Sequence, residues 1–525
     1  MNRRAFLAAS AGSLVAAGSA AAAAATAPEN AAATGSATAP PAAAPRNAPL
    51  RFDASIDDCE VLGKIPADLE GAFYRVGYEW FYPPSFADDA VLNADGYASM
   101  FRFKGGKVDY RGRWVETHRL QQLRKARRQL YGYYRNPYTD DPSIRDAARP
   151  NLRTVANTSP LVQGGKLFAL KEDGLPHQLD PNTLATIGPW DFQGKWQSQT
   201  FTAHPKLDPV SGQMISFGYE ATGLASDDLW ICTHDRAGNV QREVRTKVPY
   251  VSVIHDMAIT QKHVLIPFGG YVSSRERLLA GKVHWGWDDT KPAMIGVLPR
   301  DGDARDMRWF KGPLRCLMHT FNAQDEKNGR ITLYAPFWDS NFFPFFPPVD
   351  GKPWNPAGAR AFIRKITLDM NSRKDTWTEE ILWPMQVSDL GKVDPRVLSL
   401  PTRYAFTGFS DTERPLDRAR IGSSAPASVT NSYGRFDLAT GRLERYYAGA
   451  THNLQEPSFV PRRGGGEGDG YLVGVAENLA ERRAELVIAD AQHLADGDVA
   501  RVVLPFRISP QVHGVWADAS ELPLT

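Results

Sequence analysis

YLVGVAEN (471–478) and AELVIAD (484–490) are two apolar runs joined by a short polar segment, and they indicate how the whole chain folds. Each run is rich in Val, Ile and Leu and is too short for a typical helix, so each is predicted to be a strand. Similar runs recur along the chain and are separated by turn signals such as DPNT, RAGN and KNGR. They include KLFALKED, QMISFGYE, DLWICTHD, HVLIPFGG, RITLYAPFW and RVVLPF. Because no helical segments alternate with these strands, the pattern predicts an all-β protein rather than a parallel α/β sheet.

The length of this pattern favours a β-propeller. A sandwich or a small barrel of this length would need several domains, and no low-complexity linker interrupts the chain after residue 50. We therefore expect residues 49–525 to form one propeller domain. The innermost strand of each propeller blade lies beside a central axis, so residues that are far apart in the sequence can meet there.

Four histidines occur in strand-like segments and are far apart along the chain. They are His204 in FTAHPKLDP, His255 in VSVIHDMA, His319 in CLMHTFNA and His513 in ISPQVHGVW. Imidazole is a good ligand for Fe(II), Zn(II) and Cu(II). The spacings are too long for a zinc finger or an H-E-x-x-H helix, whose ligands come from one local element. The pattern predicts one metal site on the propeller axis; the alternative is four unconnected structural histidines.

The other seven histidines show no such pattern, and we assign them structural or surface roles. They are His118, His177, His234, His263, His284, His452 and His493.

An ordered series of motifs makes the chain similar to a known family. The series is GKIPADLEGAFYRVG (63–77), LNADGYASMFRF (92–103), ANTSP (156–160), LFALKEDGLPHQLDP (167–181), SQTFTAHPKLDPVSG (198–212), the remaining histidine segments and EPSFVPR (456–462). In this order the motifs resemble the carotenoid cleavage oxygenase family, in particular its bacterial lignostilbene dioxygenase branch. The resemblance covers most of the chain after residue 49.

The resemblance implies a seven-bladed propeller, capped by loops and helices, with one Fe(II) per chain held by His204, His255, His319 and His513. Family members also carry three glutamates that hydrogen-bond the ligand imidazoles and fix their orientation. Glu172 and Glu456 match two of them. The family's third motif, E-F-P-R, falls on Val393-Asp394-Pro395-Arg396, so a valine stands at the position of the glutamate. Asp394 can replace it if the backbone shifts by one residue; the alternative is that a backbone carbonyl or water binds the third imidazole.

The phenol-selective branch of the family holds the 4-hydroxyl group of a hydroxystilbene with a lysine and a tyrosine. The resemblance implies Lys171 as the lysine, with Tyr138 as the first choice for the tyrosine and Tyr134 as the second. A cation beside a phenol lowers the pKa of the phenol, because it favours the phenolate. The alternative for either tyrosine is simple packing. Lys171 and Glu172 are neighbours, so strict strand alternation would send them to opposite faces.

We therefore expect an Fe(II)-dependent dioxygenase that cleaves the central C=C bond of a hydroxystilbene-type or related conjugated substrate with O₂ and gives two aldehydes. No organic cofactor is expected. The alternatives are a carotenoid or apocarotenoid cleavage dioxygenase, an isomerase or monooxygenase of the same fold, and a non-enzymatic propeller that binds partners.

Charge and local composition restrict the partners. With 61 basic and 59 acidic residues there is no large field for a nucleic acid. Residues 116–137 are predicted to form an amphipathic helix with a modest apolar face, so a solvated lid is favoured over membrane contact. The aromatic segment FWDSNFFPFFPP (337–348) is the better candidate for lining a hydrophobic tunnel; the alternative is a buried loop.

The N-terminal segment resembles an export signal. Arg3 and Arg4 precede an Ala-rich apolar stretch, which predicts a twin-arginine signal peptide over 1–26 and a periplasmic or exported location. Residues 27–48 are rich in Ala and Pro and are expected to form a disordered linker. Three separated cysteines, Cys59, Cys232 and Cys316, predict no functional thiol.

Overall fold

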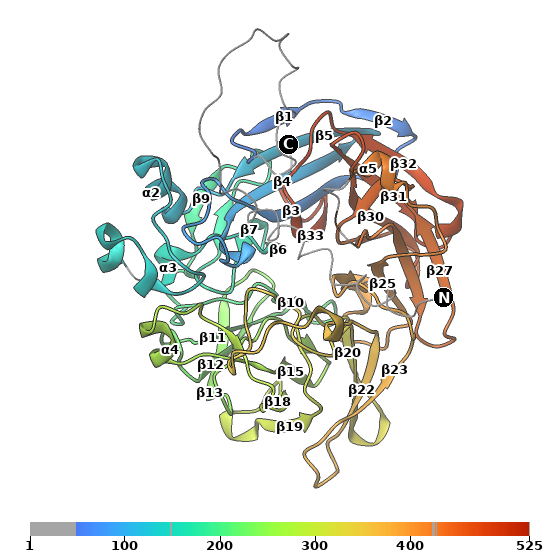
Figure 1. The fold of residues 1–525 in the computed structure, drawn as a ribbon. Coiled ribbons are helices and arrows are strands. Elements are labelled where there is room, and N and C mark those ends of the chain that lie inside the picture. Colours follow the sequence, from blue (N-terminus) through green and yellow to red (C-terminus); the bar gives the residue numbers. More distant parts are fainter. Residues whose placement is uncertain (1–48, 148–149, 423–425, 427, 524–525) are drawn as a thin grey trace, which may run out of the picture.

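A ring of β-sheets around a central axis forms the body of the protein (Figure 1). The computed structural model describes residues 49–147, 150–422, 426 and 428–523. The described residues form a seven-bladed propeller with few helices, which confirms the predicted fold class. The predicted signal peptide (1–26) and linker (27–48) lie outside the described residues.

Five blades are four-stranded antiparallel sheets that follow one another along the chain. Blade 2 contains β6 (Ser159–Gln163), β7 (Lys166–Leu170), β8 (His177–Leu179) and β9 (Thr186–Pro189), and blade 3 contains β10 (Lys206–Leu207), β11 (Met214–Tyr219), β12 (Asp228–His234) and β13 (Val240–Lys247). Blade 4 contains β14 (Ala258–Ile259), β15 (His263–Phe268), β18 (Ala293–Pro299) and β19 (Arg308–Gly312). Blade 5 contains β20 (Asn322–Asp325), β21 (Arg330–Ala335), β22 (Arg364–Asp369) and β23 (Thr378–Ile381), and blade 6 contains β24 (Gly391–Lys392), β25 (Tyr404–Phe409), β26 (Ser432–Asp437) and β27 (Leu443–Tyr447).

The two remaining blades combine strands from both ends of the described chain. Blade 1 contains β1 (Ala54–Ile56), β5 (Lys107–Trp114), β4 (Asp95–Lys104), β3 (Gly71–Glu79) and β33 (Gln511–Asp518). Blade 7 contains β28 (His452–Leu454), β29 (Ser458–Pro461), β30 (Gly470–Asn478), β31 (Arg483–Asp490), β32 (Asp498–Val503) and β2 (Glu60–Gly63). In Figure 1, β33 lies beside β3 and completes the ring. Blades 1 and 7 therefore each contain strands from the N-terminal and the C-terminal part of the described chain.

The hairpin β30–β31 shows why the strands are apolar throughout. Alternate residues of a strand point to opposite faces of its sheet. Val473 and Val475 pack into one hydrophobic cluster with Phe73 of blade 1, whereas Leu472 and Ala476 pack into another with Phe406 of blade 6. Because each blade is covered on both faces by its neighbours, both sets of side chains are buried.

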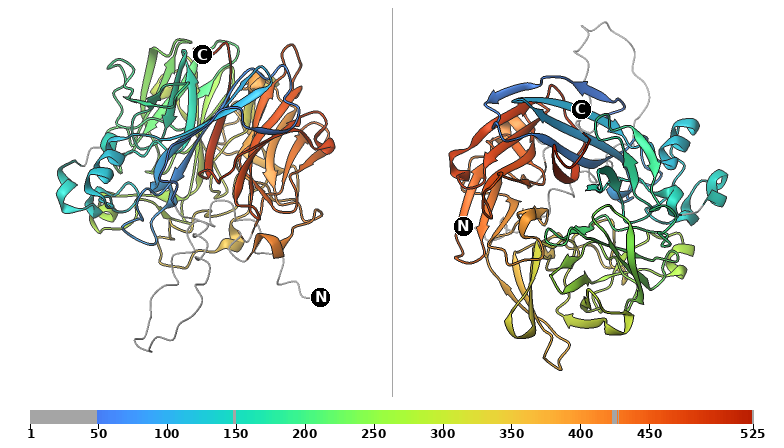
Figure 2. Two further views of the ribbon diagram at one scale, coloured as in Figure 1. Left: turned by 90° about the horizontal axis from the view of Figure 1, so that it is seen from above. Right: turned by 180° about the vertical axis from the view of Figure 1, so that it is seen from behind.

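Helices and long loops gather mainly at one face of the ring, as the side view in Figure 2 shows. The described helices are α2 (His118–Ala126), α3 (Pro150–Arg153), α4 (Arg275–Leu279) and α5 (Arg418–Ile421), and a small hairpin joins β16 (Tyr271–Val272) to β17 (Gly286–Trp287). Among the described residues, no helix is both long enough and apolar enough to cross a bilayer.

The helix predicted over 116–137 is wrong beyond Ala126. Helix α2 begins after Thr117, whose side chain accepts a hydrogen bond from the Leu120 N–H, and it ends where Arg127 takes a left-handed backbone conformation with φ of 54°. The rest of the segment is a loop that contains Gly132 and a 3₁₀ turn at Pro137–Thr139. Gly and Pro both disfavour a continuing helix.

Candidate metal centre

The four histidines of the predicted metal site converge at the propeller axis. His204, His255 and His319 each lie just before the innermost strand of a blade, at β10, β14 and β20, and His513 lies within β33. One nitrogen from each ring lies within 4.8 Å of the others. Along the series His204, His255, His319 and His513, successive Nε2 atoms are 3.1, 3.0 and 3.2 Å apart.

The hydrogen bonds behind the rings show what the cluster can hold. The Nδ1–H groups of His319 and His513 donate to Asp389 and Glu456, each at 2.8 Å. A neutral imidazole that donates through Nδ1 has only a lone pair at Nε2. The two Nε2 lone pairs therefore face each other at 3.2 Å, which is repulsive unless a cation lies between them.

The separations also suit a metal ion of ordinary size. Two nitrogens that are each ~2.1 Å from one ion, at an angle of ~90°, are about 3.0 Å apart. Nearly right-angled ligands leave coordination positions for small molecules, in contrast to a closed tetrahedral site. The donor set and its spacing thus fit a divalent metal such as iron.

Burial keeps the imidazoles of His204 and His513 in the neutral form that binds metals. It lowers the pKa of His204 well below its usual range, and the neighbouring imidazoles act in the same direction. Burial also lowers the pKa of His513 to about 4, although the Glu456 carboxylate opposes this shift. Both rings are therefore neutral at pH 7 and need no deprotonation to act as ligands.

Three carboxylates from the other three blades lie behind the histidines. Glu172 follows β7, Asp389 precedes β24 and Glu456 lies between β28 and β29. Glu172 faces His255, with 3.5 Å between Oε2 and Nδ1. Burial acts to raise the pKa of Glu172, but the Lys171 ammonium and the His255 imidazole outweigh it, and the pKa is lowered overall. Four blades thus supply imidazoles, and the other three supply carboxylates. Asp389 and Glu456 accept hydrogen bonds from two of the rings, and Glu172 faces a third ring without a hydrogen bond.

The position predicted for the third carboxylate requires correction. Asp394 does not face a histidine: its carboxylate pairs with the Arg396 guanidinium at 2.7 Å and accepts the Gly468 N–H at 3.1 Å. It also caps the 3₁₀ turn Pro395–Val397. Asp389 occupies the position instead. Placing E-F-P-R on Asp389-Leu390-Gly391-Lys392 keeps the acidic, apolar and basic positions, and this register would have found it.

A narrow, mostly apolar cavity opens beside His255 and His319. Leu92, Val253, Met318, Phe342, Phe343 and Phe346 contribute to its apolar walls. The aromatic segment 337–348 therefore does line a cavity, and its phenylalanines are also part of the buried core. Lys171, Tyr134 and Thr158 supply polar groups.

Lys171 and Tyr134 lie together in this cavity, whereas Tyr138 does not line it. The Lys171 Nζ atom is 4.9 Å from the centre of the Tyr134 ring, and the Tyr134 hydroxyl donates to Glu172 at 3.4 Å. Tyr134 is 1% exposed and Tyr138 is 44% exposed. The first choice from the sequence is thus on the surface, and the second choice is in the cavity. Lys171 and Glu172 both reach the cavity because β7 ends at Leu170, so strand alternation no longer applies.

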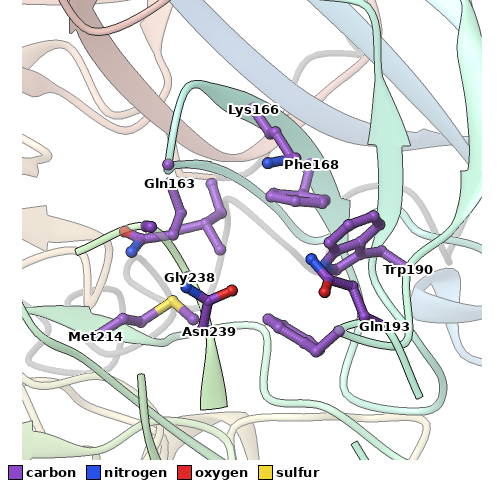
Figure 3. Close-up of a pocket in the computed structure, with 12 residues that line it drawn as sticks. Gln163, Lys166, Phe168, Trp190, Gln193, Met214, Gly238 and Asn239 are labelled. Carbon is purple, nitrogen blue, oxygen red and sulfur yellow. The ribbon is translucent and has the colours of Figure 1, made fainter. Parts of the chain in front are cut away.

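A second cavity lies away from the histidines, between blades 2 and 3 (Figure 3). It has a volume of about 220 Å³ and is lined by Phe168, Trp190 and Met214 together with Gln163, Lys166 and Asn239. None of the described residues that line it is a histidine, a cysteine or a carboxylate. It therefore lacks the residue types that usually bind a metal.

Comparisons of the sequence and of the structure with known proteins point to the same family. The profile of the family described as retinal pigment epithelial membrane protein matches residues 47–518. The chain is 39% identical to the lignostilbene-alpha,beta-dioxygenase isozyme III of Sphingomonas paucimobilis, covering 91% of this chain and 96% of that protein. It is also 39% identical to an isoeugenol monooxygenase of Pseudomonas putida, covering 89% and 96%. A crystal structure of the lignostilbene dioxygenase of Pseudomonas brassicacearum superposes with a TM-score of 0.84 at 37% identity, covering 90% of this chain and 97% of that one.

Proposed function

Because the chain belongs to the family of retinal pigment epithelial membrane protein and the carotenoid cleavage oxygenases, we propose that it is a non-haem iron dioxygenase that cleaves a C=C bond conjugated to a 4-hydroxyphenyl ring. The reaction consumes the alkene and one O₂ and forms two aldehydes, so each carbon of the double bond receives one oxygen atom. The observation that carries this proposal is the pairing of Lys171 with Tyr134 in the cavity beside His255 and His319.

Iron is the metal that we propose for the four histidines. Its donors would be the Nε2 atoms of His204, His255, His319 and His513, with Glu172, Asp389 and Glu456 orienting three of the rings. When bound, the iron would supply the activation of O₂, which a protein side chain cannot provide. The chain contributes orientation, because each ring that is held by a carboxylate has a fixed tautomer.

The remaining residues of the cavity act on the substrate. The Lys171 ammonium stabilises the phenolate form of a 4-hydroxyl group, and the Tyr134 hydroxyl can donate a hydrogen bond to the same oxygen. Electron release from the phenolate raises the electron density of the conjugated double bond. Phe342, Phe343 and Phe346 surround the apolar part of the substrate and exclude water.

A matched pair of substrates tests the proposal. The protein is purified without oxygen, its iron is quantified, and O₂ consumption is followed with 4-hydroxystilbene, 4-methoxystilbene and an apocarotenoid. We expect one iron per chain and far faster cleavage of the hydroxystilbene than of the methoxystilbene or the apocarotenoid. Equal rates on the hydroxy and methoxy compounds would remove the role of the phenolate. Cleavage of the apocarotenoid instead would favour a carotenoid-cleaving enzyme.

A shorter phenolic alkene is the second candidate substrate. The similarity to the isoeugenol monooxygenase equals that to the lignostilbene dioxygenase. Isoeugenol has the same 4-hydroxyphenyl ring and a conjugated double bond, but it lacks the second aryl ring. Comparing kcat/KM for isoeugenol and 4-hydroxystilbene decides between the two.

Export through the twin-arginine route is also proposed, on the basis of Arg3, Arg4 and the apolar stretch that follows them. Replacing both arginines by lysine should retain the protein in the cytoplasm of a bacterial host. Unchanged distribution between cytoplasmic and periplasmic fractions would refute this.

A further inference from the structure

Behind Tyr134 lies a buried polar cluster of four side chains: Arg135, Tyr219, Glu220 and His284. We propose that this cluster determines substrate selectivity, because it holds Tyr134 in the cavity where a phenolic substrate would bind. The inference rests on the proposed function and adds positioning residues that do not themselves touch the substrate.

Arg135 connects the loop of Tyr134 to blade 3. Its guanidinium forms an ion pair with the Glu220 carboxylate and donates to the Tyr219 hydroxyl at 2.7 Å. The side chains of Arg135 and Glu220 are 2% and 1% exposed. Tyr219 is the last residue of β11, and Glu220 follows it, so the contact is made to the end of a strand within the propeller body. An ion pair that is buried to this extent strongly resists separation, since each charge would remain without a partner.

His284 closes the cluster from a third segment, the chain just before β17. Its Nε2 atom lies 2.8 Å from a Glu220 carboxylate oxygen, and its Nδ1 atom lies 3.1 Å from the backbone carbonyl oxygen of Arg135. The ring is fully buried. His284 therefore contacts both the Arg135 backbone and the Glu220 carboxylate, whereas Glu220 and Tyr219 hold the Arg135 side chain.

The backbone conformation shows why such support is needed. Arg135 has a φ of 54°, in the left-handed region that costs energy for any residue except glycine. Such a conformation persists only when surrounding contacts enforce it. Since Tyr134 precedes this residue directly, the conformation at Arg135 determines the path of the loop on both sides and the direction of the Tyr134 ring.

Contacts on the other side of Tyr134 complete the restraint. The Tyr134 N–H donates to Asp89 at 2.9 Å, and the ring stacks on Phe346 with 6.1 Å between centroids. Asn136 donates to the carbonyls of Leu278 and Lys282. The Tyr134 hydroxyl, which donates to Glu172 at 3.4 Å, is then the part of this side chain that can meet a ligand beside Lys171. Small displacements of a positioning group can change rates by a large factor, so selectivity should depend on the cluster.

A second cluster, between blades 6 and 7, has the same composition and provides matched controls. There Glu485 accepts from Arg501 at 2.7 Å and from His452 at 3.0 Å, and Arg501 donates to the Tyr446 hydroxyl at 3.3 Å. No residue of this cluster lines the metal cavity. Changes made there report the general cost of disrupting a buried network.

The experiment measures selectivity, defined as kcat/KM for 4-hydroxystilbene divided by that for 4-methoxystilbene, in the full-length iron-loaded enzyme. Glu220→Gln and Tyr219→Phe are compared with Glu485→Gln and Tyr446→Phe. Tyr219→Phe removes one oxygen atom and keeps the ion pair, so it remains informative if Glu220→Gln does not fold. We expect selectivity to fall about tenfold in the first pair, with unchanged iron content, and to stay constant in the second pair.

Two outcomes would overturn the inference, and they differ from the failure of the proposed function. Unchanged selectivity in Tyr219→Phe and Glu220→Gln, in a selective parent enzyme, shows that the cluster does not position Tyr134. An equal loss in Glu485→Gln and Tyr446→Phe shows a general effect of destabilisation. If the parent enzyme itself does not discriminate between the two stilbenes, the phenolate role of the site is wrong and the inference fails with it.

Discussion

His319 donates its Nδ1–H to Asp389 at 2.8 Å, and this bond joins blade 5 to blade 6 directly behind the candidate metal centre. Contact with the imidazole lowers the pKa of Asp389, although burial acts to raise it. The carboxylate is therefore ionised at neutral pH and can hold His319 with Nε2 directed at the axis.

The first prediction concerns this carboxylate. Asp389→Ala should lower iron affinity or turnover by roughly 10–100-fold, because His319 loses the partner that fixes its tautomer. Iron content by metal analysis and O₂ consumption provide the measurement. Asp394→Asn is the control, since Asp394 pairs with Arg396 rather than with a histidine. A larger loss of iron from the Asp394 variant would restore the assignment made from the sequence.

Removal of a candidate metal ligand should lower iron content and activity more than removal of the carboxylate behind a ligand. His255→Ala takes away one of four nitrogens from a cluster that has no carboxylate among its converging donors. We expect the variant to fold and to lose both its bound iron and its activity. His263→Ala is a control, because His263 pairs with Asp325 outside the cluster. Full iron occupancy in the His255 variant would show that the ligand set is wrong.

A third prediction concerns acid stability. Burial lowers the pKa of His234 to about 4, and the ring is fully buried beside Ser216. The unfolded chain therefore binds this proton more readily, so His234 contributes stability above pH ~6.5 that is lost as the pH falls towards 4. Between pH 7 and 4.5 the loss should be about 2 kcal/mol.

Urea unfolding at both pH values checks this. In His234→Gln the loss of stability on acidification should be smaller by about that amount. His493→Gln, at an exposed position, should behave like the parent protein. An unchanged pH dependence in the His234 variant would contradict the prediction.

The fold and the four histidines could be predicted because their signals are local. Each strand is a short apolar run between turns, and each histidine lies in or next to such a run, so the propeller geometry alone brings them together. The sequence does not identify Asp389, because Val393–Arg396 shares its proline and arginine with the E-F-P-R motif. The motif is therefore aligned with the wrong segment. Only the distance to His319 reveals the correct one.

Which tyrosine lines the cavity depends on contacts that no local sequence pattern contains. Tyr134 and Tyr138 lie four residues apart in one loop, and both follow the end of α2. The ion pair between Arg135 and Glu220, which are far apart in the sequence, adjoins Tyr134 and is proposed to hold it in the cavity. Tyr138 belongs to the 3₁₀ turn Pro137–Thr139, and its side chain is exposed. The sequence offers no signal that Arg135 pairs with Glu220.

The two tyrosines give the fourth prediction. Tyr134→Phe should lower kcat/KM for 4-hydroxystilbene by about tenfold, because it removes a hydrogen bond that the proposed site makes to the substrate. Tyr138→Phe should have no effect, since its side chain is 44% exposed. Steady-state kinetics of both variants decide the assignment; a loss in Tyr138→Phe alone would restore the first choice from the sequence.

Lys171 supports the last prediction, which separates a phenolic substrate from a polyene. An ammonium group stabilises a phenolate, whereas a polyene offers it no acidic hydroxyl. Lys171→Met should therefore reduce cleavage of 4-hydroxystilbene by about 100-fold or more. Its iron content should not change, because Lys171 is not among the converging donors. Methylation of the substrate hydroxyl should reproduce the loss in the parent enzyme, and the methylated substrate should then be insensitive to the mutation. If Lys171→Met instead cleaves an apocarotenoid at the rate of the parent enzyme, the cavity serves a carotenoid, and the lysine is only a buried cation beside Glu172.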